Sequence, residues 1–109
     1  MKIKTSELIG PALDWAVAKC EGVLFPRSIP KYTTDWSQGG PIIGKEGITI
    51  RTNACASGHW AAFIDFGGSN TNIKARQSGP TPLIAAMRCY VASKLGDEVE
   101  VPNELIKEI

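Results

Sequence analysis

Apolar residues recur with helical spacing near both ends of the chain. The segment 11–22 begins with Pro11 and ends with Gly22, residue types that favour the first turn and the left-handed end of a helix. The segment 81–96 is bounded in a similar way by a capping threonine and a final glycine. Its expected buried stripe consists of Ile84, Met87, Val91 and Leu95. Arg88 falls outside this stripe, so its replacement by alanine is expected to change stability little.

A third helix is predicted over 35–46, with Thr34 as its N-cap. Trp36 shares a helical face with Ile43, which predicts that the indole is a core residue packed against a sheet. The run Gly39-Gly40-Pro41 interrupts the pattern and predicts a kink or a split in the helix. The two glycines are expected to permit close packing on the sheet. Before the first helix, a separate turn capped by Thr5 or Ser6 is also expected.

Alternating apolar and polar residues predict three strands in the middle of the chain, over 47–53, 59–66 and 72–77. The second segment has apolar residues on both faces, so it is expected to be central and covered on both sides. The connecting segments are rich in turn residues, which favours antiparallel hairpins. A further short extended piece is expected around Val99 and Val101.

This order of elements predicts an α+β fold. A small antiparallel sheet of about three strands would pack with an N-terminal helix, a kinked middle helix and a C-terminal helix. The chain has 109 residues, which is long enough for one core and too short for two ordinary domains. Residues 1–109 are therefore expected to form a single domain. Its end, 97–109, is an acidic tail with five acids against one lysine.

Composition excludes several functional classes. The net charge of +1 gives no overall electrostatic argument for nucleic acid or membrane partners. No apolar run approaches the roughly 18 residues of a membrane span, and the first residues lack the apolar core of a secretory signal. Three cysteines cannot pair completely within one chain, which fits a reducing cytosol.

Candidate catalytic and metal-binding residues are few. His59 is the only histidine, and Cys55 lies four residues before it. No nucleophile-elbow motif surrounds either residue, and the pair supplies two zinc ligands where a structural site needs four. Cys20 and Cys89 fall within apolar helices, where cysteine behaves as a small hydrophobic residue. No catalytic residue, metal or cofactor is predicted, and the protein is not expected to be an enzyme.

Several segments together resemble a phage protein family. Similarity to the NinX-like family of small lambdoid-bacteriophage proteins is found in MKIKTSEL, ALDWAVAK, TDWSQGGPII and GPTPLIAAMRCYVASKLGDEVEVP. The phage alpha-beta-alpha sandwich domain proteins are a more distant resemblance. It depends on Tyr32 to Asp35 before a helix, a tryptophan-containing strand and an alanine-rich final helix. These resemblances imply a phage origin and helices packed on a small sheet, and they imply no catalytic residues.

Two surfaces are candidates for binding. Asp35, Trp36 and Gln38 would form a recognition patch of an acid, an aromatic ring and an amide, if Trp36 is not a core residue. Arg51, Lys74 and Arg76 are expected on the outer face of the sheet. They would contact nucleic-acid phosphates, or they would simply form a solvated face. The order of elements is similar to that of double-stranded-RNA-binding domains, although such domains need a denser basic cluster.

These observations predict a phage accessory protein that acts as a non-catalytic protein-interaction module in the cytoplasm of the infected host. Its partner would be an unidentified host or phage protein, without involvement of a membrane. Self-association into a homo-oligomer is compatible with this prediction. The alternative is a nucleic-acid-binding accessory factor that uses the basic sheet face.

Overall fold

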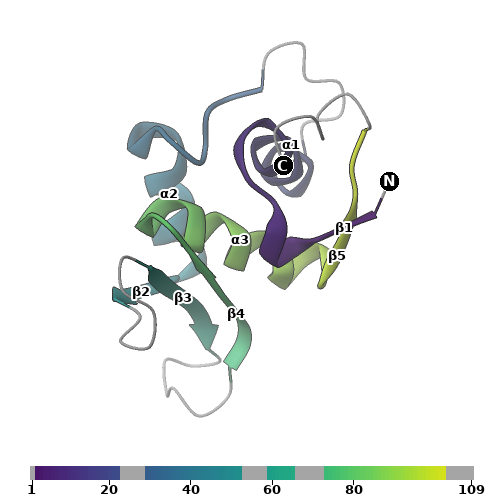
Figure 1. Ribbon diagram of the computed structural model, residues 1–109. Helices are drawn as coiled ribbons and strands as arrows, with labels where there is room; N and C mark the ends of the chain where they lie inside the picture. The colour runs from purple at the N-terminus through teal and green to yellow at the C-terminus, as the bar shows by residue number, and fades with distance from the viewer. Residues whose placement is uncertain (1, 23–28, 53–58, 66–72, 103–109) are drawn as a thin grey trace.

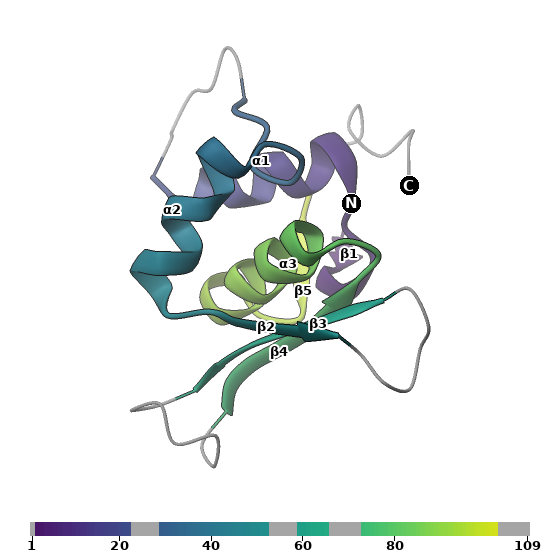
Figure 2. The ribbon, with the colours of Figure 1, turned by 90° about the vertical axis from the view of Figure 1, so that its left-hand side faces the viewer.

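The computed structural model describes residues 2–22, 29–52, 59–65 and 73–102, apart from the side chains of residues 65, 73 and 74. A central helix, α3 (Pro82–Leu95), separates a three-stranded sheet from two further helices (Figures 1 and 2). Those two helices are α1 (Gly10–Cys20) and α2 (Trp36–Glu46). The predicted α+β class with three helices is therefore confirmed.

The sheet is antiparallel in the order β2-β3-β4, with bounds Thr49–Thr52, Trp60–Asp65 and Ile73–Gly79. The prediction that the middle strand is central is confirmed. Ala62 and Ile64 of β3 belong to the core beneath α3. Because successive side chains of a strand point to opposite faces, Ala61 and Phe63 lie on the face turned away from α3.

A second, two-stranded sheet was not predicted. It pairs β1 (Lys2–Lys4) with β5 (Glu98–Glu100) in antiparallel register. Ile3 lies opposite Val99, and both side chains are buried. On either side of this apolar pair, lysines of β1 lie opposite glutamates of β5. The extended piece expected around Val99 is thus a strand that joins the two ends of the described chain.

The turn expected before α1 is present as the 3₁₀ helix η1 (Thr5–Glu7), but neither Thr5 nor Ser6 caps it. The hydroxyl of Thr5 instead donates to the carbonyl oxygen of Gly96 at 2.7 Å. The N–H of Thr5 donates to the carbonyl oxygen of Asp97, also at 2.7 Å. Thr5 is fully buried, so both groups connect the N-terminal segment to the end of α3.

Helix α3 is buried around most of its circumference because it lies between the sheet and the other helices. Its predicted ends are confirmed: the Thr81 hydroxyl accepts from the N–H of Ile84 at 3.1 Å, and Gly96 has a positive φ of 88°. Every residue from Leu83 to Val91 is buried, so the predicted stripe was too narrow. Arg88 is only 9% exposed, which contradicts its placement outside the buried surface.

Helix α2 is continuous through Pro41, so the predicted split does not occur. Its N-cap is Asp35 and not Thr34, because the Asp35 carboxylate accepts from the N–H of Ser37 at 2.9 Å. A carboxylate is a strong cap for the free N–H groups of a first helical turn.

The close packing expected at the glycines of α2 occurs at Gly39. A Cβ atom at this position would overlap the carbonyl oxygen of Tyr32 and lie 2.6 Å from Leu83 Cδ1. Leu83 belongs to α3, so Gly39 packs against that helix and not against the sheet. A Cβ atom at Gly40 would meet only the ring of Trp36, at 3.9 Å, so the close packing expected at Gly40 does not occur.

Candidate functional site

Trp36 is the large apolar side chain that the fold leaves in solvent. Its side chain is 54% exposed, and no other large hydrophobic residue in the described part of the chain is classed as exposed. This contradicts the prediction that Trp36 is a core residue against the sheet. The buried residues of α2 are Gly39 and Ile42, whereas Trp36 lies in the first turn, beside the start of α3, where the core ends.

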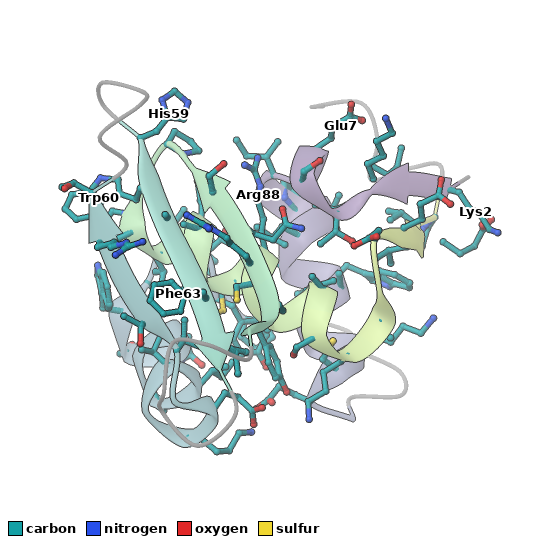
Figure 3. All side chains as sticks on the ribbon, turned by 90° about the horizontal axis from the view of Figure 1, so that it is seen from below. Lys2, Glu7, His59, Trp60, Phe63 and Arg88 are labelled. Carbon is teal, nitrogen blue, oxygen red and sulfur yellow. The ribbon has the colours of Figure 1, made fainter. Side chains whose placement is uncertain are left out.

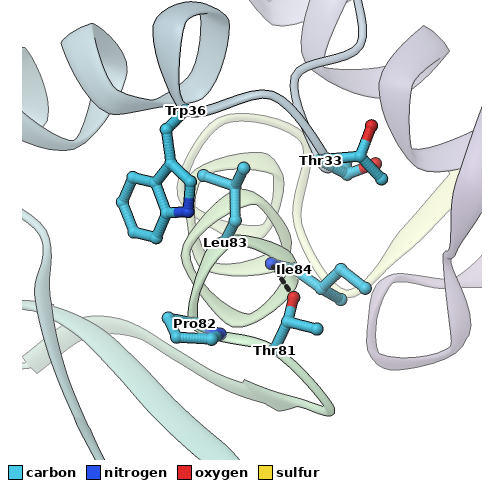
Figure 4. A pocket seen from close by; sticks show the side chains of 7 residues that line it. Thr33, Trp36, Thr81, Pro82, Leu83 and Ile84 are labelled. Atoms are coloured by element: carbon cyan, nitrogen blue, oxygen red, sulfur yellow. Dashed lines mark hydrogen bonds between the residues drawn. The ribbon is translucent and has the colours of Figure 1, made fainter.

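Trp36 borders a groove between the first turns of α2 and α3, which we call the Trp36 groove (Figure 4). Its volume is about 260 Å³. The groove is lined by Thr33, Thr34, Trp36, Thr81, Pro82, Leu83 and Ile84. The Thr81 hydroxyl accepts from the N–H of Ile84, and the lining also contains Thr33 and Thr34 beside the apolar side chains of Trp36, Pro82, Leu83 and Ile84.

Asp35 lies in the chain between two residues that line the groove, Thr34 and Trp36. The side chain of Asp35 is exposed, and it accepts hydrogen bonds from the N–H and the hydroxyl of Ser37 at 2.9 and 2.7 Å. The Ser37 hydroxyl and N–H lower the pKa of the Asp35 carboxyl. Asp35 is therefore a negatively charged cap at the start of α2.

Gln38, the third residue of the predicted patch, lines a different pocket of about 280 Å³. That pocket is formed by Glu21, Tyr32, Ser37, Gln38, Pro41, Ile42 and Lys45. Of the three residues, Trp36 therefore lines one groove and Gln38 another pocket, and Asp35 lines neither of them. The residues of α3 that complete the Trp36 groove, above all Pro82 and Leu83, were not among the predicted site residues.

Glu21 is the centre of an ionic cluster at the Gln38 pocket. Its Oε2 atom accepts from the hydroxyl of Tyr90 at 2.5 Å and from the ammonium of Lys45 at 2.9 Å. Burial raises the pKa of Glu21, but the Tyr90 hydroxyl and Lys45 outweigh burial, so the pKa is lowered overall. The cluster joins the end of α1 to α2 and α3, which is a structural role.

Asp14 positions the segment that borders the Trp36 groove. It is buried on α1, and its carboxylate accepts from the N–H of Thr33 at 2.9 Å. Burial raises the pKa of Asp14, which hydrogen bonding to Thr33 and the charge of Lys31 offset only in part. The one sequence signal for this role is an acid flanked by the apolar residues Leu13 and Trp15.

The basic sheet face is present as predicted for Arg51 and Arg76, whose side chains are exposed. The Arg51 guanidinium lies 5.3 Å from the centre of the Phe63 ring, and Arg76 pairs directly opposite Phe63. Phe63 itself is only 5% exposed, so its ring is not available for a base to stack on. The side chain of Lys74 lies outside the described residues.

The residues considered for catalysis and metal binding are described only in part. His59 is exposed next to the start of β3, and Cys55 lies outside the described residues. Within the described ranges, no group of three or more histidine, cysteine and acidic residues is arranged to hold a metal ion. Burial raises the pKa of Cys20 to about 11 and that of Cys89 to about 12, so neither is a thiolate near neutral pH.

Comparison with known proteins identifies the family. A family model described as "Bacteriophage P22, NinX" matches residues 4–94, a range that includes the Trp36 groove and the basic sheet face. No match was found among the curated proteins. None of the helices in the described ranges is long and apolar enough to cross a membrane. Because the family model covers most of the sequence, the chain belongs to the bacteriophage P22 NinX family.

Proposed function

We propose that the protein is a non-catalytic protein-interaction module that contacts its partner through the Trp36 groove. Membership of the phage NinX family suggests an accessory protein of the phage. The single observation that supports the interaction role is the exposure of Trp36 beside an apolar concavity. Tryptophan is enriched among the residues that dominate binding energy at protein interfaces. A single exposed apolar residue needs no explanation, but one that borders an apolar groove suggests a contact site.

The partner in this proposal is a host or phage protein in the cytoplasm of the infected cell. Neither a cofactor nor a catalytic residue is assigned. The exposed charge of Asp35 would lie at the polar rim of such an interface, and the groove would receive an apolar side chain at its centre.

Affinity capture from infected cells tests this proposal when the recovered proteins are quantified after nuclease treatment. We expect Trp36→Ala to lose the specific partner while its melting temperature stays close to that of the wild type. Trp36→Phe should retain part of the recovery, because a smaller aromatic ring can still border the groove. Gln38→Ala is the matched control, since Gln38 is exposed on the same helix and lines the other pocket. Equal recovery with the wild type and Trp36→Ala would contradict the proposal.

A second candidate function is nucleic-acid binding through the sheet face. The observation that favours it is the placement of two exposed arginines, Arg51 and Arg76, around Phe63 on the face turned away from α3. Phosphate contacts release counterions, so this type of binding weakens steeply as salt concentration rises.

Duplex DNA and RNA binding measured at several salt concentrations tests the second candidate. Joint replacement of Arg51, Lys74 and Arg76 by serine should reduce both the affinity and its salt slope. Lys31→Ser is the matched control, because Lys31 is exposed but precedes α2 and lies outside the sheet. Micromolar binding that is unchanged in the triple variant would rule out this surface.

A further inference from the structure

Strand β2 forms one edge of the three-stranded sheet. Within the described part of the chain, β2 pairs with β3 on one side and faces no strand on the other (Figure 1). Three of its four side chains are exposed: Thr49, Arg51 and Thr52. The β2–β3 ladder runs without a register shift, and β2 contains no proline. An edge of this kind presents N–H and C=O groups to which another strand can bond.

The opposite edge of the sheet, formed by β4, is less regular. The carbonyl oxygen of Ser78 accepts from Nη1 of Arg88 at 2.9 Å, and the β3–β4 ladder shifts register between Ile64 and Asp65. Irregularities of this kind hinder the addition of a strand. Of the two edges, β2 is therefore the one suited to pairing with another strand.

The ladder shows which groups of β2 point away from β3. Opposite residues of antiparallel strands alternate between pairs that exchange hydrogen bonds and pairs that do not. The Ser78 carbonyl is directed to Arg88, so the pair of Ser78 with Ala61 is one that does not. Ala61 then exchanges hydrogen bonds with the residue opposite it on β2, Arg51. The N–H and C=O of Arg51 thus point to β3, and those of Ile50 point to the free side.

The segment before β2 indicates the same direction. The N–H of Ile48 donates to the carbonyl oxygen of Ile43, in the last turn of α2, at 3.1 Å. It is therefore not bonded to β3. Backbone groups two residues apart on a strand point the same way, so the N–H of Ile50 also points away from β3. Two separate contacts thus place a free donor and a free acceptor at Ile50.

We propose that β2 pairs in antiparallel register with β2 of a second copy of this chain, about a twofold axis at Ile50. The two Ile50 residues would exchange a pair of N–H···O=C hydrogen bonds. Their side chains would meet on the α3 side of the sheet, where Ile50 already packs against the core. On the other face, Thr49 of each copy would lie opposite Arg51 of the other. This pairing goes beyond the proposed function, which uses the Trp36 groove.

The sequence of β2 is complementary to itself in this register. An axis at Arg51 would place two guanidinium groups directly opposite each other, which destabilises a sheet. A shift by one residue would place Ile50 opposite Arg51 and mix the apolar and polar faces. An axis at Ile50 keeps the apolar side chains together and places each cation opposite a neutral hydroxyl. A twofold contact of this type closes after two copies.

Sedimentation equilibrium over a series of protein concentrations, up to the millimolar range, tests this pairing. We expect a reversible equilibrium between monomer and dimer. Amide exchange locates the contact, because the N–H of Ile50 should exchange more slowly as the concentration rises. The N–H of Arg51 should be equally protected at every concentration, since it bonds to β3 in the monomer. A chain that stays monomeric throughout would overturn the proposal, also if Ile50 became protected only by binding a different protein.

Two substitutions of opposite charge at Thr49 test the register. In the dimer, Thr49→Glu would form two exposed ion pairs with Arg51, which should tighten dimerisation roughly two- to thirtyfold. Thr49→Lys should weaken it by a similar factor, because like charges would lie opposite each other. Ser78→Lys is the matched control and should leave the dimer unchanged, since Ser78 is exposed on the same face of the sheet at the other edge. Equal dimer affinities of the two Thr49 variants would show that β2 does not pair in this way.

Discussion

The Nε atom of Arg88 donates a hydrogen bond to the carbonyl oxygen of Leu8 at 2.8 Å, although the two residues are 80 positions apart. A second guanidinium nitrogen, Nη1, donates to the carbonyl oxygen of Ser78 at 2.9 Å. One buried side chain of α3 thus contacts both the segment after η1 and the strand β4, as Figure 3 indicates. Burial lowers the pKa of Arg88 below its ordinary value, and the bonds to two carbonyl oxygens provide acceptors for the buried cation.

Arg88→Ala is therefore expected to lower the free energy of unfolding by about 2–4 kcal/mol, because two buried carbonyl oxygens lose a charged donor. The free energy of unfolding of Arg88→Lys should lie between those of the wild type and Arg88→Ala, since an ammonium keeps the charge but cannot reproduce the planar fork of the guanidinium. Arg76→Ala, at an exposed position of the sheet, should change stability by no more than about 0.5 kcal/mol. Urea titrations provide the comparison, and equally small effects at both arginines would contradict the role of Arg88.

Replacement by alanine should change the stability of the protein in opposite directions at two glycines of α2. Gly39→Ala is expected to destabilise by about 1–3 kcal/mol, because its Cβ atom would overlap Tyr32 and Leu83. Gly44 has open space around the position of a Cβ atom, so Gly44→Ala should stabilise by about 1 kcal/mol through its better helix propensity. Both variants can be compared by thermal melting. A stabilising Gly39→Ala would show that α2 does not approach α3 this closely.

The Glu21 cluster predicts a specific dependence of stability on pH. Because the pKa of Glu21 is lowered in the folded protein from 4.5, its contribution is fully present above about pH 4.5 and is lost as the pH falls through the folded-state pKa. Tyr90→Phe removes one of the two donors, so we expect about 1 kcal/mol less stability at neutral pH and a weaker loss between about pH 5 and pH 3. Urea titrations across this range measure the difference. If the stability of Tyr90→Phe depended on pH in the same way as that of the wild type, the hydrogen bond from Tyr90 would not be what lowers the pKa of Glu21.

The two described thiols should react slowly in the native protein. With Cys55 replaced by serine, Cys20 and Cys89 are the remaining cysteines. Since burial raises both pKa values to about 11 or 12, only roughly one thiol in a thousand or fewer is a thiolate at pH 8. A chromogenic disulfide reagent should therefore modify them much faster in urea than in buffer. Rapid modification of both thiols in buffer would contradict their burial.

The helices and hairpins were predictable because their signals are local. Pro11, Thr81 and Gly96 mark helix ends by their own backbone and capping chemistry, and these positions are confirmed. The β1–β5 sheet was not predictable in this way. It pairs Ile3 with Val99, and strands of three residues are too short to show an alternating pattern.

The candidate site was predictable only in part. Helical spacing wrongly placed Trp36 on the buried face of α2, because it cannot show that the first turn lies at the edge of the core, beside the start of α3. Arg88 was wrongly predicted to lie outside the buried surface for a similar reason. Its hydrogen-bond acceptors, Leu8 and Ser78, belong to other elements, and the spacing within α3 does not indicate them. The position of Asp35 beside Trp36 was available from the sequence, whereas the opposite wall of the groove was not.

The free energy of unfolding of Trp36→Ala, measured by urea titration, tests most directly whether Trp36 is a binding residue. The indole is 54% exposed, so its removal should lower stability by no more than about 1.5 kcal/mol. A side chain that is free to contact a partner adds little to the folded state alone. A loss of about 3–5 kcal/mol, the range for a large buried aromatic residue, would show that Trp36 is part of the core and would contradict the account.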